Sequence, residues 1–284
     1  MIRKIKSIRN AEATLEGAGV YLKRAFGYYQ QPEYDPFLML DDFRNDDPDK
    51  YLPGFPWHPH RGIETITYML EGAAEHGDSL GNHGVIHKGE VQWMTAGSGI
   101  IHQEMPKPNK KGRMYGFQLW TNLPAKEKMC KPRYRDLRAK DLPVVRTPEG
   151  ASVKIISGEF NGVRGPVEDI YVQPHYYDVQ LSENSNLSLP TAPGFTCFIY
   201  VYSGTCFTSD TKLGNTQLVL FEDGDKVEIS TQDTECSFLF LCGKPLGEPV
   251  AWRGPIVMNT REEIRLAFQE LEQGNFIKDR VQSK

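Results

Sequence analysis

The sequence predicts an all-β protein of the sandwich or barrel type, built as two β-rich halves with one helix near the end. Its apolar segments are short and are interrupted throughout by Gly, Pro, Asn and Asp, which is typical of strands joined by turns. The chain has 26 Gly and 19 Pro among 284 residues, and 39% of its residues are hydrophobic. This composition indicates many turns and enough apolar side chains for a sizeable core.

In the first half, three segments have the length and the β-branched or aromatic content of strands. They are GIETITYML at 62–70, GEVQWMTAG at 89–97 and RMYGFQLWTNL at 113–123. The second half supplies further strand candidates of the same kind: SVKIISGEF, YYDVQLS, FTCFIYVYSG, TQLVLFEDGD, KVEIS and CSFLFLCG. In both halves a strand ends in a hairpin with Gly, at Gly72 and Gly204, and a later strand follows Gly-Glu or Gly-Asp. Two barrels of similar topology would produce this repetition.

The segment 260–274, TREEIRLAFQELEQG, is the one that clearly predicts a helix. Thr260 can cap its start, and Glu263 stands at the capping-box position. Apolar residues follow at the spacing of one helix face, and Gly274 is a typical stop. We therefore expect an N-terminal barrel over 1–139, a linker over 140–150, and a C-terminal barrel over 151–284 that ends in this helix.

The overall charge and composition exclude several classes of function. A net charge of -4 and a pI near 6.0 argue against direct nucleic-acid binding, and no DNA-reading motif is present. No run approaches the roughly 18 apolar residues of a membrane span. The basic start of the chain is not followed by a signal-peptide pattern, and five cysteines without Cys-x-x-Cys spacing fit a reducing compartment. We expect a cytoplasmic protein.

Two pairs of metal-preferring residues stand two positions apart in the first half. His58 and His60 lie in FPWHPHRG, and His102 and Glu104 lie in GSGIIHQEMP. In a strand, residues i and i+2 leave the same face, so each pair can chelate. If neighbouring strands carry the two pairs, three imidazoles and a carboxylate converge, with room for water or substrate on one divalent metal. Fe(II), Mn, Co, Ni and Cu all suit such a ligand set.

The remaining polar residues of this region have alternative interpretations. Glu64 would share the face of His58 and His60 in a regular strand, unless a bulge at Gly62 turns it away or it orients a histidine from outside the ligand set. His76, His83 and His87 lie in a polar, Gly-rich connection, so we expect them to be exposed. After residue 104 the sequence has one histidine, His175, and no such pair. The second half is therefore expected to bind no metal.

Together these motifs resemble the pirin family of the cupin superfamily. The similarity is carried by HPHRGIETITYMLEG, by HGDSLGNHGVIHKGEVQWMTAGSGIIHQEMP and by GFQLWTNLP, and it continues in IISGE and GEPVAWRGPIVMNTREEI. It implies a bicupin, two tandem jelly-roll barrels with a metal in the N-terminal one. The family's ligands correspond to His58, His60, His102 and Glu104. Glu64 matches a carboxylate ligand of other cupins that pirins do not use.

The resemblance implies two kinds of role. One is an oxidoreductase of the quercetin 2,3-dioxygenase type that cleaves a flavonol with O2 and releases carbon monoxide, with Fe(II) as the preferred metal. Glu104 would then accept the substrate's hydroxyl proton, and Phe117 or Trp120 would line an apolar wall. The alternative is a regulator that senses metal or redox state and binds a protein partner. The expected partners are thus a flavonol and O2 or a protein, without direct nucleic-acid or membrane binding.

Overall fold

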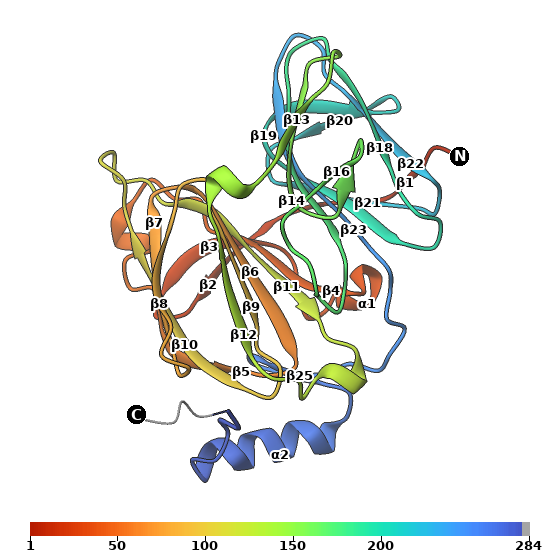
Figure 1. Cartoon of the computed structure of the whole chain (residues 1–284). Helices are drawn as coiled ribbons and strands as arrows, with labels where there is room; N and C mark the ends of the chain where they lie inside the picture. Colours follow the sequence, from red (N-terminus) through yellow and green to blue (C-terminus); the bar gives the residue numbers. More distant parts are fainter. Residues whose placement is uncertain (280–284) are drawn as a thin grey trace. The chain divides into compact units, whose positions relative to one another are not determined.

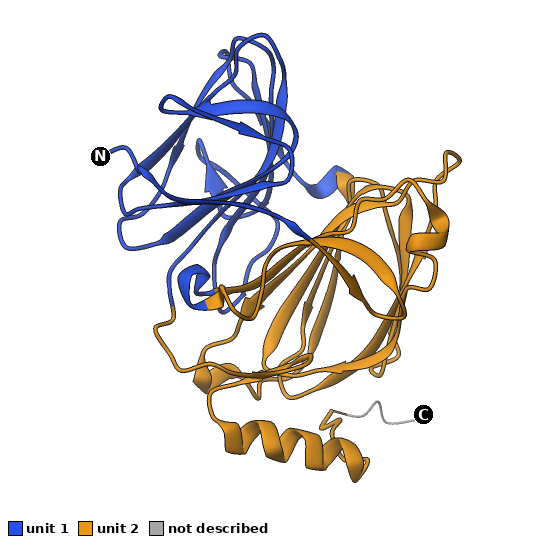
Figure 2. Ribbon diagram, turned by 180° about the vertical axis from the view of Figure 1, so that it is seen from behind, with its two compact units in different colours: residues 1–12, 32–36, 140–245 blue, residues 13–31, 37–139, 246–284 orange. Residues whose placement is uncertain are grey.

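The computed structural model describes residues 1–279 and forms two compact units, each of which combines distant parts of the chain (Figure 2). Unit 1 contains Met1–Glu12, Pro32–Pro36 and Lys140–Pro245, and unit 2 contains Ala13–Gln31, Phe37–Ala139 and the described residues from Leu246 onward. Near the middle of the chain, the boundary between the two units lies between residues 139 and 140. They differ from the expected division at both ends of the chain, because the first residues lie with the second half and the last residues lie with the first half.

Unit 2 is a barrel of two sheets that curve around one interior (Figure 1). The strand order is β12-β9-β6-β11-β4-β3-β2 in one sheet and β5-β10-β7-β8 in the other. Its elements are β2 (Glu12–Glu16), β3 (Val20–Phe26), β4 (Phe37–Asp42), β5 (Phe55–His60), β6 (Ile63–Glu71), β7 (Ala73–Asp78), β8 (His83–His87), β9 (Val91–Thr95), β10 (Ile100–Lys107), β11 (Tyr115–Asn122), β12 (Arg133–Leu137), β24 (Ala251–Arg253), β25 (Ile256–Met258), the 3-10 turns η1 (Pro48–Lys50) and η2 (Ala125–Glu127), and helix α2 (Arg261–Glu272).

Unit 1 is a second barrel, in which the first strand of the chain pairs with a late one. Its main sheet has the order β1-β21-β19-β23-β17-β14-β13, and β18, β20 and β22 join at β19 and its neighbours. The elements are β1 (Ile5–Asn10), β13 (Val144–Arg146), β14 (Ala151–Ser157), β15 (Glu159–Phe160), β16 (Val163–Arg164), β17 (His175–Leu181), β18 (Asn186–Pro190), β19 (Thr196–Thr208), β20 (Thr211–Gly214), β21 (Gln217–Phe221), β22 (Lys226–Ser230) and β23 (Cys236–Gly243). The short helix α1 (Gln31–Tyr34) and the turn η3 (Ala139–Asp141) complete the set of elements.

The interior of unit 1 is filled with apolar side chains. Inward residues alternate along its strands, for example Cys197, Ile199 and Val201 on β19 and Phe238 and Phe240 on β23. Four of the five free cysteines are part of this core. The described interior of unit 1 is therefore built for packing.

The expected all-β class with a C-terminal helix is confirmed. Helix α2 has the predicted capping box: the Thr260 hydroxyl accepts from the Glu263 backbone N–H, and the Glu263 carboxylate accepts from the Thr260 N–H. Ile264 and Ala267 on its buried face pack against β25. Among the described residues, no helix combines the length and the apolar character needed to cross a membrane.

Arg3 anchors the start of the chain inside unit 1, and its replacement by Met is expected to cost about 3 kcal/mol of unfolding free energy. The side chain is 1% exposed. It donates to the Thr191 hydroxyl at 2.7 Å and to the carbonyls of Glu222 and Ala192 at 2.9 Å, and all three acceptors would lose a partner. Urea unfolding measures the effect. The exposed Arg9 is the control, since Arg9→Met should change stability by less than about 0.5 kcal/mol. Equal effects of the two substitutions would contradict this role.

Candidate metal centre

Three histidines from two neighbouring strands meet on the inner face of unit 2. His58 and His60 lie on β5 and His102 lies on β10, and the antiparallel register places His102 opposite His58. Their candidate ligand nitrogens all lie within 4.8 Å of one another. The period of two along each strand directs these side chains to one side of the sheet. The structure thus brings together three of the four expected site residues.

The hydrogen bonds of two of the rings determine which nitrogen is free. His58 Nδ1 lies 2.8 Å from the Pro56 carbonyl and His60 Nδ1 lies 3.1 Å from the Pro255 carbonyl. A carbonyl can only accept, so both Nδ1 atoms donate a proton, and in a neutral ring of this tautomer the lone pair lies at Nε2. These two Nε2 atoms lie 3.0 Å apart. Two facing lone pairs at this distance call for a cation between or beside them.

His102 adds a third nitrogen donor without a competing partner. The residue is fully buried, and within residues 1–279 neither of its ring nitrogens has a hydrogen-bond partner. A buried polar group without a partner is costly unless something else binds it. Burial, followed by the nearby His60 and His58, holds the pKa of His102 well below its usual value. The pKa of His60 is likewise held well below its usual value by burial and by His58. Three neutral imidazoles can hold a divalent metal, and this donor set does not select one metal.

The C-terminal segment of the chain supports one of these ligands. Pro255, whose carbonyl accepts from His60, lies between β24 and β25. The Lys128 ammonium holds this segment to the barrel, because it donates to the carbonyls of Gly62 and Val257 at 2.9 and 3.0 Å. A carbonyl behind a metal-binding histidine orients the ring and selects its tautomer. Nothing in the local sequence around His60 indicates this partner.

Glu104 lies near the histidines, but its carboxylate accepts a hydrogen bond from Thr67. Its Oε1 accepts from the Thr67 hydroxyl at 2.7 Å, and the Thr67 oxygen also lies 2.8 Å from the side-chain amide of Gln118. A register shift in the β10–β5 pairing falls between His102 and Glu104. The carboxylate is not part of the three-histidine group, although Glu104 lines the same cavity as His58 and His60.

Glu64 belongs to a different strand from His58 and His60. Gly62, with φ +77°, lies between β5 and β6, so the regular strand that would align residue 64 with the histidines does not form. Glu64 is fully buried on β6, where its carboxylate accepts from the Thr95 hydroxyl at 2.7 Å. Burial raises its pKa.

His76 is the residue of this region that the sequence interpretation missed. His83 and His87 are exposed as expected, but His76 is buried on β7, so that expectation was wrong for His76. Its ring lies 5.3 Å from that of His102, and its Nε2 lies 3.2 Å from a carboxylate oxygen of Asp78. The spacing of His76 and Asp78, two positions apart as in His58 and His60, was the signal that could have revealed it.

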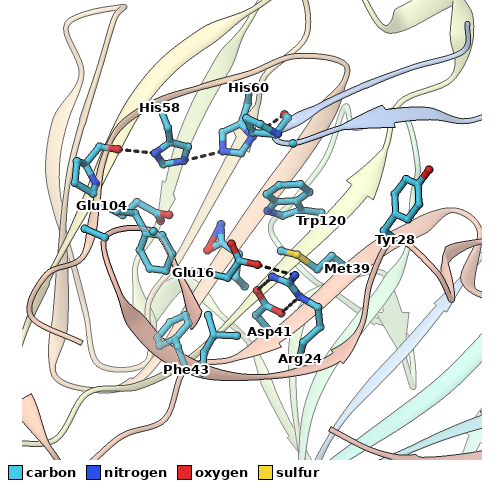
Figure 3. Close-up of a pocket in the computed structure, with 18 of the residues that line it drawn as sticks. Glu16, Arg24, Tyr28, Met39, Asp41, Phe43, His58, His60, Glu104 and Trp120 are labelled. Atoms are coloured by element: carbon cyan, nitrogen blue, oxygen red, sulfur yellow. Dashed lines mark hydrogen bonds and ion pairs between the residues drawn. The ribbon is translucent and has the colours of Figure 1, made fainter. Parts of the chain in front are cut away.

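A cavity of about 710 Å³ opens beside the histidines in unit 2 (Figure 3). Trp120 lines it as expected, and its ring lies 5.0 Å from that of His60, whereas Phe117 is fully buried in the core. The lining combines three kinds of side chain: possible ligands, aromatic and apolar groups, and charged groups, which include His58, His60, Glu104, Tyr28, Met39, Phe43, Phe55, Trp120, Trp252, Glu16, Arg24 and Asp41. A cavity of this size and mixed lining is typical of a small-molecule site.

The metal-free protein is expected to lose stability as the pH falls below about 6.5. The folded-state pKa values of His60 and His102 are depressed, so the unfolded chain takes up protons first, and each histidine contributes up to about 1.4 kcal/mol per pH unit in that range. Above the unfolded pKa this contribution is fully present. Chemical unfolding from pH 7.5 to 5 measures the slope. The double variant His60→Gln/His102→Leu should flatten it, and the exposed-site variant His83→Gln should not. An unchanged slope in the double variant would refute the assignment.

Two β-barrels in one chain, with a histidine cluster at a cavity in one of them, define a two-barrel cupin protein. Residues 19–121 match the family model described as Pirin, and residues 176–277 match the one described as Pirin C-terminal cupin domain. The chain belongs to the pirin family.

Relatives of known name and structure agree with this membership. A pirin-like protein of Caulobacter vibrioides is 42% identical, with 97% of this chain and 99% of that protein covered. A Pseudomonas aeruginosa protein, whose name assigns it provisionally as a quercetin 2,3-dioxygenase, is 41% identical, with 96% and 97% covered. The crystal structure of quercetin 2,3-dioxygenase from Acinetobacter baumannii has a TM-score of 0.90 at 30% identity, with 97% of this chain and 99% of that chain covered.

Proposed function

We propose that this chain is a metal-dependent dioxygenase that cleaves the ring of flavonols such as quercetin with O2 and releases carbon monoxide. The observation that carries the proposal is that two members of the histidine cluster, His58 and His60, line an aromatic-lined cavity of about 710 Å³. A metal bound there would be open to a small planar molecule. Membership of the pirin family and the similarity to the Acinetobacter baumannii enzyme support the same activity.

His58, His60 and His102 would hold the metal, and Glu104 would complete the ligand set from the same wall of the cavity. We assign Fe(II) as the working metal, and Mn, Co, Ni and Cu suit the same donors. For Glu104 to bind the metal, its side chain must turn from the position in which Thr67 donates to it. When bound, the metal supplies Lewis acidity and a template for the substrate oxygen.

The chain's own residues position the substrate and accept its proton. The Trp120 and Trp252 rings, whose centroids lie 5.9 Å apart, offer an apolar surface for the flat flavonol rings. We assign the Glu104 carboxylate, once it has turned from the position in which Thr67 donates to it, as the acceptor of the substrate's 3-hydroxyl proton. Glu104 is only 8% exposed, so bulk water does not compete freely for this proton transfer.

The test is reconstitution of metal-free protein with Fe(II), Mn, Co, Ni or Cu in separate samples, with quercetin loss and carbon monoxide followed under O2. We expect metal-dependent turnover, and the metal that gives the fastest turnover identifies the working ion. Glu104→Gln should keep metal on the three histidines but lower kcat by about 10²–10⁴-fold, the usual contribution of a general base. If each metal binds and none supports turnover above that of Glu104→Gln, the dioxygenase proposal is wrong, and the second role, a metal-responsive regulator with a protein partner, becomes the one to test.

A further inference from the structure

Three charged side chains form an ionic cluster in the wall of the cavity, which we call the Arg24 cluster: Glu16 on β2, Arg24 on β3 and Asp41 on β4. The Arg24 guanidinium forms a bidentate pair with Asp41, with Nε–Oδ1 at 2.8 Å and Nη2–Oδ2 at 2.7 Å. Its Nη1 lies 2.8 Å from Glu16 Oε1. Figure 3 shows Arg24 and Asp41 across the cavity from His58 and His60.

The Arg24 cluster has capacity left to bind a ligand. Arginine has five N–H donors, and three of them are engaged by the two carboxylates. Each carboxylate oxygen can accept more than one hydrogen bond, so lone pairs remain beside the free N–H groups. The cluster carries one positive and two negative charges when ionised. A group that both donates and accepts, such as a phenolic hydroxyl, suits this surface, whereas a carboxylate would be repelled by the net negative charge.

The position of these three residues adds to their chemistry. Asp41 is 3% exposed and holds Arg24 in place, whereas the Arg24 and Glu16 side chains keep 28% and 40% of their surface accessible to a ligand. Apolar side chains also line the cavity, and Figure 3 shows Trp120 between His60 and the Arg24 cluster, with Met39 beside Asp41. The cavity therefore has polar groups both at the candidate metal centre and at the Arg24 cluster, with the Trp120 ring between His60 and the cluster.

We propose that Glu16, Arg24 and Asp41 form a second recognition site, which binds hydroxyl groups on the end of the ligand remote from the metal centre. The cluster selects polyhydroxylated planar aromatic ligands over counterparts that lack these hydroxyls or carry a carboxylate there. The inference rests on the proposed function in placing the reactive end of the ligand at the histidines. The inference adds which part of the ligand the protein recognises, and it concerns binding of the ligand and not turnover.

The test is a binding cycle with two ligands and two variants, performed on protein loaded with Zn(II), which has no redox chemistry. Quercetin and 3-hydroxyflavone share the 3-hydroxyl and the neighbouring carbonyl, but only quercetin carries further ring hydroxyls. Quenching of tryptophan fluorescence gives Kd for each. We expect quercetin to bind the native protein roughly tenfold more tightly than 3-hydroxyflavone, the size expected for a hydrogen bond to a charged group. In Glu16→Gln most of this preference should disappear, with Kd for 3-hydroxyflavone unchanged.

Matched controls separate this role from a structural one. Glu75→Gln removes an exposed carboxylate on β7 of the same unit and should leave both affinities unchanged. Asp41→Asn removes the other negative charge of the Arg24 cluster, and circular dichroism verifies that this variant folds. If the cluster had only a structural role, its substitution would lower the affinity for both ligands equally or for neither. That result overturns the inference. If neither flavonol binds the Zn(II)-loaded native protein, the proposed function fails instead, so the two failures are distinguishable.

Discussion

Replacement of His102 by Leu is expected to abolish tight binding of a divalent metal while leaving the metal-free protein folded. His102 is fully buried, and within residues 1–279 its ring has no hydrogen-bond partner. An apolar side chain of similar size therefore removes an unsatisfied polar group, and the stability of the metal-free protein should stay the same or increase. Loss of one of three imidazoles should cost more than the ~10–100-fold in affinity that follows loss of an outer partner of a ligand.

Thermal unfolding with and without metal measures this effect. A metal present at about 1,000 times its Kd stabilises the native protein by about 4 kcal/mol, and this stabilisation should vanish in His102→Leu. The exposed His83 provides the control, since His83→Leu should keep the full metal-dependent rise in Tm. If His102→Leu binds metal with native affinity, His102 is not a ligand and the centre has been assigned incorrectly.

The second large effect is expected at Arg61, which holds the C-terminal segment against the barrel of unit 2. The side chain is 2% exposed and donates to the carbonyls of Ser98 at 2.7 Å and Phe276 at 2.9 Å. It also pairs with Glu270 of α2 at 2.8 Å and lies over the Phe276 ring at 4.2 Å. Arg61→Met would leave both carbonyls without this donor and would leave Glu270 with Lys278 as its remaining cationic partner. Breaking a buried pair in this way costs about 3–5 kcal/mol.

Arg61→Met should also weaken metal binding, although Arg61 is not a ligand. The carbonyl of Pro255 that orients His60 belongs to the same segment, so loosening the segment removes an outer partner, with an expected loss of ~10–100-fold in affinity. Urea unfolding and metal titration measure the two effects. Arg265 of α2, which forms an exposed pair with Glu262, is the matched control, and Arg265→Met should change neither quantity appreciably. Native stability and affinity in Arg61→Met would show that the segment is not held in this way.

Features that depend on neighbouring residues were predictable from the sequence. Thr260 and Glu263 stand three positions apart and form the expected capping box. His58 and His60 leave one face of β5 because the period of a strand is two. In both cases the geometry of one short segment determines the result, so the pattern of residues is sufficient.

The predictions that differed from the structure depended on partners far away in the chain. His76 lies in a polar, Gly-rich stretch that is typical of an exposed connection, but β7 pairs with β10 and places it opposite Glu104. The alignment of Glu64 with the histidines required one regular strand, and Gly62 divides that stretch into β5 and β6. Strand pairing and strand breaks in a barrel are decided by the whole sheet, and local propensity does not specify them.

By itself, the sequence determined the all-β class, the capped C-terminal helix and the two histidine-bearing segments, because each follows from the spacing of residues within one element. Tertiary structure alone decided that the segment 246–279 supports the histidine centre and that Arg24 meets Asp41 in the cavity wall. It also decided that β1, at the start of the chain, pairs with β21 within unit 1. These contacts join residues that are far apart in the chain or on separate strands, and the chain forms them because backbone groups and buried charges must find partners once water is excluded.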